Sequence, residues 1–600
     1  MNIRKDVYLV LFFFGLVLPG IGVTPFAPAA ESRSFFEYSS ETWEKRISSL
    51  HRKNKLLEVS AYPELRRFAA MQVAEKYRAE ITQIWGEPRD EFPMFLDKHS
   101  ELLENFWLAL EPQHDDVPAA MKLLRQIWEF SPVRLKEFPE LAIAIAVVWD
   151  QPDSAAFEDS GGQHQAVPAP NRATALDNFQ YYSSDQLPLG KWIKAFPWEW
   201  LCYVVRNKTS AEERRWTIAN YSHRIHELEK AYFDIKWTCD EPPPLKDKPY
   251  TLMNMKKYGG VCACQADYAA SLCRNMGMPA FWAAYWSRFD YAHAWVIRFD
   301  VKKLSKGKIY FTIKEEGNYN KAKQFVTWIR CPHTAQEINE AVILHRLDRV
   351  GTNLIAYRRT DILMRCFDSL VKTESLTPDQ QLALLLKINA ISPGCDKAWK
   401  TILDILAKEP QFTDDNGSEK ERTKAILKLN DKMVREWIRF PNELPKYTET
   451  LLANPLIRKQ EKTIYGKLLR ALDERRRPDL AISVAANYAE SLLNRKKFDE
   501  ATELLTTVVL RYYDVADSTN LAFDKIRTIS EQDFTQTPKL SAFYLQLLPN
   551  VFNTKSDLPK GYKKEVLELA LQTFRKTGNQ NHIMAAQKQL TILENEKKEK

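Results

Sequence analysis

The stretch Gly259-Gly260-Val261-Cys262-Ala263-Cys264 decides how the centre of this chain is organised. A glycine pair lets the backbone turn tightly before a helix begins. After Cys262, small and apolar residues recur at spacings of four, three, four and three, which is the period of one helix face. The residues that share this face are Ala266, Ala269, Cys273 and Met276. We therefore expect a packed helix that begins at Cys262 and ends at Gly277.

Cys262 is the candidate nucleophile because it heads this helix. Unpaired amides and the helix dipole favour the thiolate at a helix N-terminus, and the thiolate is the reactive form of cysteine. Cys264 follows two positions later, about 200° around the helix axis. The two thiols cannot face the same partner, so one of them is structural.

Three strand-like runs follow the predicted helix. They span Ala280 to Trp286, Ala292 to Asp300 and Ile309 to Ile313, and a turn at Lys306-Gly307 separates the last two. Alternation along the second run places His293 on one face with Trp295, Ile297 and Phe299. A cysteine at a helix start and a histidine at a strand start suit a thiol nucleophile with its base.

Three motifs in order resemble the transglutaminase-like superfamily. They are Gly260-Val261-Cys262, then Gly277-Met278-Pro279-Ala280 fifteen residues after the cysteine, then His293-Ala294-Trp295-Val296. The resemblance covers about residues 190 to 335. It implies a papain-like α+β core in which Cys262 is the nucleophile, His293 is the base and an acidic residue orients the imidazole.

The third catalytic residue has no clear counterpart. The arginine usual after Pro-Ala is replaced by Phe281, and the family's later aspartate motif would align Lys314 with the acid. Pairing Lys303 with Lys308 across the turn instead places Glu316 one diagonal from His293 on the same face. Glu316 is therefore the predicted orienting residue, and Glu315 and Asn318 are the alternatives.

The eight cysteines leave two further questions open. Disulfides are one option for an exported chain. Six of the cysteines fall within or just before the core, and the first and last of these, Cys202 and Cys331, could pair with others. A zinc site built from Cys262, Cys264 and His293 is a second option, although Cys-x-Cys without another close ligand pair is a weak metal signal. We predict no metal and no cofactor.

Residues 1–30 read as a secretory signal segment. Arg4 and Lys5 precede an apolar run from Val7 to Leu18, and Ala27-Pro28-Ala29 offers a cleavage site. An uncleaved N-terminal anchor is the alternative. We expect export to the periplasm, the cell surface or the medium, and no membrane contact after cleavage. The net charge of +8 is spread thinly, so no nucleic-acid partner is predicted.

The flanks of the core are expected to be helical. Residues 31–175 contain four apolar-periodic segments and then a Pro- and Gly-containing linker, 176–335 form the core, and 336–600 form a second helical region. Around Ala398 and Ala501, 103 residues apart, the second region resembles tetratricopeptide repeats, whose period is about 34 residues. This predicts an α-solenoid and a surface for a protein partner, and an irregular helical bundle is the alternative.

Two functions from different classes follow. The first is an exported cysteine hydrolase or acyltransferase that attacks a peptide or protein amide through a Cys262 thioester, with water or an amine as acceptor. The second is a scaffold that keeps the fold without catalysis and binds protein partners through its helical repeats. Tryptophans between residues 192 and 237 serve either the core or the walls of a substrate groove.

Overall fold

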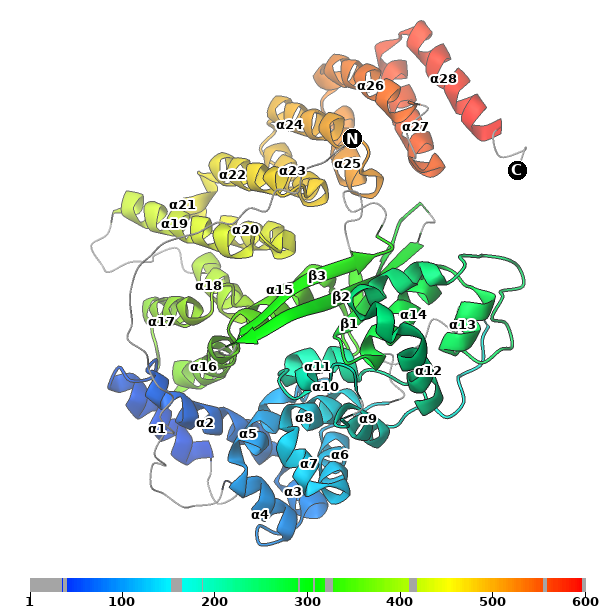
Figure 1. The fold of residues 1–600 in the computed structure, drawn as a ribbon. Helices are drawn as coiled ribbons and strands as arrows, with labels where there is room; N and C mark the ends of the chain where they lie inside the picture. The colour runs from blue at the N-terminus through cyan, green and yellow to red at the C-terminus, as the bar shows by residue number, and fades with distance from the viewer. Residues whose placement is uncertain are drawn as a thin grey trace.

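The computed structural model describes residues 35, 40–152, 165–185, 187–289, 292–305, 308–318, 327–408, 418–553 and 558–595. The predicted signal segment, part of the predicted linker and the Lys306-Gly307 turn lie outside these residues. The described chain is mixed α+β, with one antiparallel sheet flanked in sequence by many helices (Figure 1). This confirms the α+β class with helical flanks.

The sheet has five strands in the order β3-β2-β1-β4-β5. The three predicted strands are present as β1 (Ala280–Trp286), β2 (Ala292–Ser305) and β3 (Lys308–Glu316). The short strands β4 (Trp328–Arg330) and β5 (Glu337–Asn339) were not predicted. Three residues are too few to show the alternation by which a strand is recognised in a sequence.

The predicted register between β2 and β3 is wrong. Ser305 pairs with Lys308, so both strands continue to the turn, and an irregularity between Val301 and Lys303 then shifts the pairing by one residue. As a result Glu316 lies opposite Val296. A shift of one residue moves a side chain to the other face of a sheet, which removes the argument that placed Glu316 on the face of His293.

The two faces of the sheet are buried against different helices. Ala294 and Val296 of β2 share a hydrophobic core with α14 (Cys262–Asn275). Trp295 and Ile297 belong instead to the core formed with the N-terminal helices. The sheet therefore separates the helix that carries the cysteine from the N-terminal region.

The N-terminal helices and those around the sheet follow one another closely. The first group is α1 (Ser40–Arg52), α2 (Tyr62–Ala74), α3 (Arg78–Trp85), α4 (Glu91–Lys98), α5 (Ser100–Ala109), α6 (Val117–Phe130), α7 (Pro132–Glu137) and α8 (Pro139–Val148). The second is α9 (Ala175–Tyr182), α10 (Gly190–Ile193), α11 (Trp198–Val205), α12 (Ala211–Tyr221), the 3₁₀ segment η6 (Ser222–Asp234) and α13 (Leu252–Tyr258). One hydrophobic core joins α8, α11 and the sheet, across the boundary predicted at residue 175.

Helix α14 has the predicted start, and its last helical residue is Asn275. Gly277 has a φ of +84°, and its amide and that of Met278 bond the carbonyls of Arg274 and Cys273. This is the hydrogen-bond pattern of a Schellman C-cap, in which glycine is favoured. At the other end, a Cβ on Gly260 would lie 2.7 Å from the Cβ of Cys264, so the turn before α14 has no room for a side chain.

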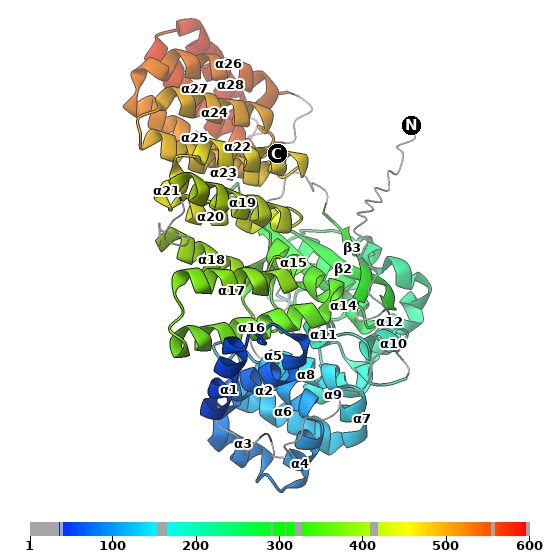
Figure 2. The ribbon, with the colours of Figure 1, turned by 90° about the vertical axis from the view of Figure 1, so that its left-hand side faces the viewer.

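The C-terminal region forms a curved row of helices (Figures 1 and 2). Its members are α15 (Glu340–Thr352), α16 (Leu354–Thr373), α17 (Pro378–Ile391), α18 (Asp396–Lys408), α19 (Glu419–Trp437), α20 (Leu444–Leu452), α21 (Pro455–Arg458), α22 (Glu461–Glu474), α23 (Pro478–Leu493), α24 (Phe498–Arg511), α25 (Ala516–Gln532), α26 (Thr537–Val551), α27 (Lys560–Thr577) and α28 (Gln580–Asn595). Successive helices pack on each other, α23 on α24 and α25, and α24 on α26. The resemblance to tetratricopeptide repeats itself stays a prediction.

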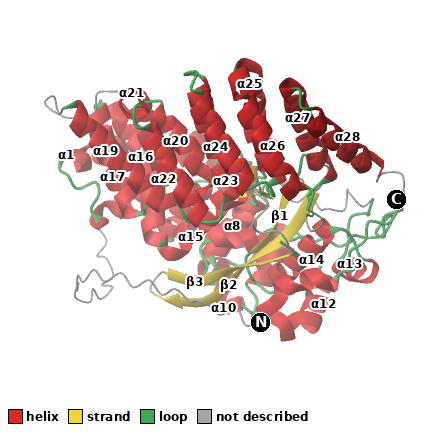
Figure 3. Cartoon of the chain, turned by 90° about the horizontal axis from the view of Figure 1, so that it is seen from above, coloured by secondary structure: helices red, strands yellow, loops and turns green. Residues whose placement is uncertain are grey.

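The row also contacts the connection between β1 and β2 through Arg288 and Phe289; Figure 3 shows the row and the sheet from above. Arg288 forms an ion pair with Glu565 of α27 at 2.9 Å, and its backbone amide donates to Asp517 of α25. The ring of Phe289 meets Tyr562 edge to face at 5.9 Å. The far end of the row is thereby attached close to the start of β2.

Within the described residues, we find no helix that is both long and apolar enough to cross a membrane.

Gly260→Ala is expected to destabilise the protein. Its new methyl group would overlap Cys264, and overpacking of this kind costs roughly 1–3 kcal/mol. Gly466→Ala in α22 is the matched control, because nothing lies within 4 Å of its added Cβ and alanine favours a helix by roughly 0.5–1 kcal/mol over glycine. Calorimetry should give a lower Tm for the first variant and an equal or higher Tm for the second. Equal Tm values for Gly260→Ala and wild type would show that the turn can relax.

Candidate active site

Cys262 is the partly exposed cysteine at the start of α14. Burial raises the pKa of its thiol above the ordinary value. The backbone amides of Ala294, Ala263 and Cys262 itself act in the opposite direction, because they stabilise the thiolate. The expected influence of the helix N-terminus is therefore present, but burial outweighs it, and the thiol is neutral at pH 7.

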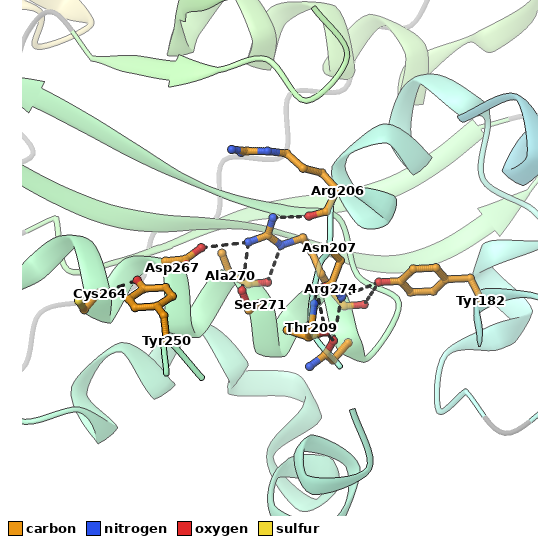
Figure 4. Close-up of polar contacts among 11 residues, drawn as sticks. Tyr182, Arg206, Asn207, Thr209, Tyr250, Cys264, Asp267, Ala270, Ser271 and Arg274 are labelled. Carbon is orange, nitrogen blue, oxygen red and sulfur yellow. Dashed lines mark hydrogen bonds and ion pairs between the residues drawn. The ribbon is translucent and has the colours of Figure 1, made fainter. Parts of the chain in front are cut away.

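Cys264 is the structural member of the pair. It is fully buried beneath the glycine turn, the hydroxyl of Tyr250 lies 3.9 Å from its sulfur, and burial raises the pKa of its thiol to about 12 (Figure 4). Cys273, on the packed face of the helix, is equally buried, and its pKa is likewise raised by burial to about 12. Of the three thiols on α14, Cys262 alone is accessible.

A buried polar network holds the second half of α14 in place (Figure 4). Arg274 donates to the carbonyl of Arg206 at 2.6 Å and forms an ion pair with Asp267 at 3.3 Å. The amide of Asn207 donates to the hydroxyl of Tyr182 at 2.8 Å. Since buried polar groups that are satisfied in this way rigidify their surroundings, the helix that carries Cys262 is firmly anchored.

His293 is buried near the start of β2. Its Nε2 lies 2.5 Å from the carbonyl oxygen of Gly317. A carbonyl only accepts, so Nε2 carries the hydrogen and Nδ1 is the basic nitrogen in the neutral ring. Burial lowers the pKa of His293, and the bond to Gly317 opposes this shift. The imidazole is therefore neutral at pH 7 and able to accept a proton.

Gly317 was not among the predicted site residues. Its φ is +87°, and a Cβ there would lie 2.5 Å from the ring of Tyr232. The hydroxyl of Tyr232 in turn donates to the carbonyl of Ala294 at 3.0 Å. The glycine directly after β3 was the visible signal in the sequence, since it ends a strand where a side chain would not fit.

Cys262 and His293 reach the same end of β2 from different faces of the sheet. The thiol lies near the amide of Ala294, the residue that follows His293. The imidazole stacks on Trp295, with ring centroids 6.2 Å apart, on the face turned toward the N-terminal helices. Within the described residues, no hydrogen bond joins the thiol to the imidazole. Both residues thus lie at the start of β2, on different faces of the sheet and without a hydrogen bond between them in the described chain.

The candidates for the third residue are separated by the register of β3. Glu316 lies opposite Val296 and shares the α14 face, and its carboxylate accepts from the Gly317 amide at 3.4 Å. Glu315 lies opposite Ile297, on the face of His293, and accepts from Asn318 at 3.2 Å. The imidazole itself donates to the Gly317 carbonyl and stacks on Trp295.

Neither a metal centre nor a disulfide is formed by these residues. Among the residues that the structure describes, no three His, Cys, Asp or Glu side chains are grouped closely enough to hold a metal ion. All eight cysteines lie in the described ranges and all are free thiols. The predicted zinc alternative therefore gains no support from the geometry.

Comparisons with protein-family models, with curated proteins and with solved structures found no match to this chain.

Alkylation should report the state of the Cys262 thiol. Because its pKa is raised, we expect iodoacetamide to label it slowly at pH 7 and about tenfold faster per pH unit up to at least pH 9. Mass spectrometry can compare Cys262 with the exposed Cys239 and with the buried Cys264 in the same sample. A labelling rate that levels off below pH 8 would contradict the raised pKa.

Proposed function

We propose that this chain is an exported, thiol-dependent acyl-transfer enzyme of the transglutaminase-like type, with a papain-like arrangement of nucleophile and base. Its most favoured reaction is hydrolysis of a peptide or protein amide through a thioester on Cys262. The observation that carries the proposal is the accessible thiol of Cys262 at the amide of Ala294, the residue that follows the neutral, buried His293 in β2. The order of the three sequence motifs supports the same class.

In this proposal, His293 acts first as base and then as acid. Nδ1 takes the thiol proton while Sγ bonds to the amide carbonyl carbon. When the C–N bond breaks, the same proton goes to the departing amine and leaves a thioester. Water then attacks the thioester, His293 takes a proton from it, and the proton returns to the sulfur as the acid product leaves.

The imidazole of His293 must move before it can take a proton from the Cys262 thiol. The imidazole must turn from Trp295 toward the edge of β2 where the thiol lies. The hydrogen bond from Nε2 to the Gly317 carbonyl fixes the tautomer in which Nδ1 is the basic nitrogen. Binding of a substrate across the start of β2 is the event that we expect to favour this rearrangement.

The helix start supplies the groups that would stabilise the negative charge on the substrate oxygen. The backbone amides of Cys262 and Ala263 point toward the thiol, as their effect on its pKa indicates. Amides fixed at a helix N-terminus suit a developing oxyanion. The exposed indole of Trp237 lies nearby, because its backbone is bridged to Gly260, and offers an apolar wall for the substrate.

The alternative is a catalytically inactive scaffold that binds protein partners through the C-terminal helical row. The separation of Cys262 and His293 onto two faces favours this alternative, as does the raised pKa of the thiol. The catalytic proposal is preferred because Cys262 alone of the α14 thiols is accessible, which a purely structural cysteine does not require.

Hydrolysis of fluorogenic peptide amides is the direct test. We expect Cys262→Ala and His293→Ala each to lower kcat/KM by at least about 10³-fold, because either change removes a member of the pair. Cys264→Ala is the matched control: this thiol is buried, so its loss should affect stability more than turnover. Intact-mass spectrometry should show an acyl adduct that disappears in Cys262→Ala. If no peptide or amine substrate yields turnover or an adduct, the result would contradict the catalytic proposal and favour the alternative, a scaffold that binds protein partners.

Glu316→Gln and Glu315→Gln test what orients the imidazole. If the Gly317 carbonyl holds the tautomer, both variants should keep kcat/KM within about tenfold of wild type. Loss of an orienting carboxylate costs about 10⁴-fold in the serine-protease triad. A loss of that size in Glu316→Gln alone would restore the carboxylate predicted from the sequence, despite its position opposite Val296.

A further inference from the structure

A cavity lies away from the cysteine, where three parts of the chain meet. Its volume is about 160 Å³, and its walls come from α5 of the N-terminal region, α11 beside the sheet, the segment after β4, and α15, α16 and α18. Cys262 and His293 are not among the lining residues. The cavity is therefore distinct from the candidate active site.

Two arginines in its wall lack a carboxylate partner. Arg346 and Arg349 are three positions apart on α15, which places them on one side of that helix. In the part of the chain that the structure describes, neither forms an ion pair. Arg349 donates from Nη2 to the carbonyl and hydroxyl of Ser392, and its buried Nε has no hydrogen-bond acceptor.

The other cations in the wall are neutralised by acids. Arg358 pairs with both Glu199 and Glu140, and Asp361 pairs with Arg365 at 3.3 Å and with Lys397 at 2.7 Å, so three cations meet three carboxylates. His333 is paired with Asp115 at 3.0 Å. These groups are engaged with each other and leave little charge for a ligand.

Glu111 is the one lining acid that we find without an ion pair among the described residues. Asp396 also lines the cavity, and it pairs with Lys400 at 2.8 Å. Two unpaired guanidinium groups against one unpaired carboxylate leave a surplus of one positive charge. Both arginines are partly buried, and an unpaired charge that is taken out of water is costly. A ligand with a single negative charge would therefore balance this site.

The volume of the cavity and its lining residues further limit the class of ligand that it can bind. Tyr203 and Tyr357 line the cavity together with Trp198, so part of its wall is aromatic. A dry cavity of about 150 Å³ is large enough to hold benzene. Guanidinium groups bind carboxylates through paired hydrogen bonds. The chemistry thus selects a small monocarboxylate with a flat apolar body.

We propose that this cavity binds a small aromatic or similarly apolar monocarboxylate, held by Arg346 and Arg349. The site is independent of the proposed acyl transfer. Because its walls come from the N-terminal region, from the helices beside the sheet and from the C-terminal row, an occupied cavity would tie all three together.

Benzoate is the probe that tests the proposal on the full chain. Titration calorimetry should detect binding to the wild type at one site. Arg346→Met removes a charge-assisted contact and should weaken that binding by at least about tenfold, and Arg349→Met should weaken it in the same direction. Arg439→Met is the matched control, because Arg439 is exposed, pairs with Asp348 just outside the cavity, and should leave binding unchanged.

A second measurement separates binding from folding. Without ligand, Arg346→Met should unfold at a Tm equal to or above that of the wild type, because it removes an unpaired charge from the partly buried cavity wall. Benzoate should raise the Tm of the wild type and not that of Arg346→Met. Inorganic phosphate is the second probe, and a Tm rise with phosphate but not benzoate would overturn the carboxylate assignment. Equal benzoate affinity in wild type and Arg346→Met would overturn the site itself.

Discussion

The close packing of the N-terminal end of α14 against the glycine turn and β2 is the constraint on which the rest of the centre depends. Residue 260 has no space for a Cβ, because Cys264 lies directly beneath it. Gly277 ends the same helix in a conformation that side chains rarely adopt. The helix is thereby held at both ends, and the thiol of Cys262 is presented at the edge of the strand that carries His293.

The same packing sets the electrostatics of the thiol. A helix N-terminus favours a thiolate, and the backbone amides around Cys262 do lower its pKa, yet burial between the helix and the sheet raises it by more. Burial likewise lowers the pKa of His293. Both groups are neutral at pH 7, so any catalysis here proceeds by proton transfer on encounter with substrate rather than from a standing ion pair.

The C-terminal row joins this centre at two places. Its first helix, α15, packs against β3 and supplies the two unpaired arginines of the cavity. Its far helices, α25 and α27, bind Arg288 in the connection that leads into β2. The row therefore contacts both the cavity and the approach to His293.

The sequence by itself determined the local structure. The three- and four-residue spacing after Cys262 defined α14, Gly277 marked its end, and alternation predicted β1, β2 and β3, because these signals lie within single elements. Tertiary structure alone decided the register of β3, since an irregularity at Val301 and two more paired residues at the turn moved Glu316 to the other face. It also decided the carbonyl partner of His293, the direction of the Cys262 pKa shift and the cavity at Arg346. Each of these depends on atoms brought together from distant positions, which no local pattern records.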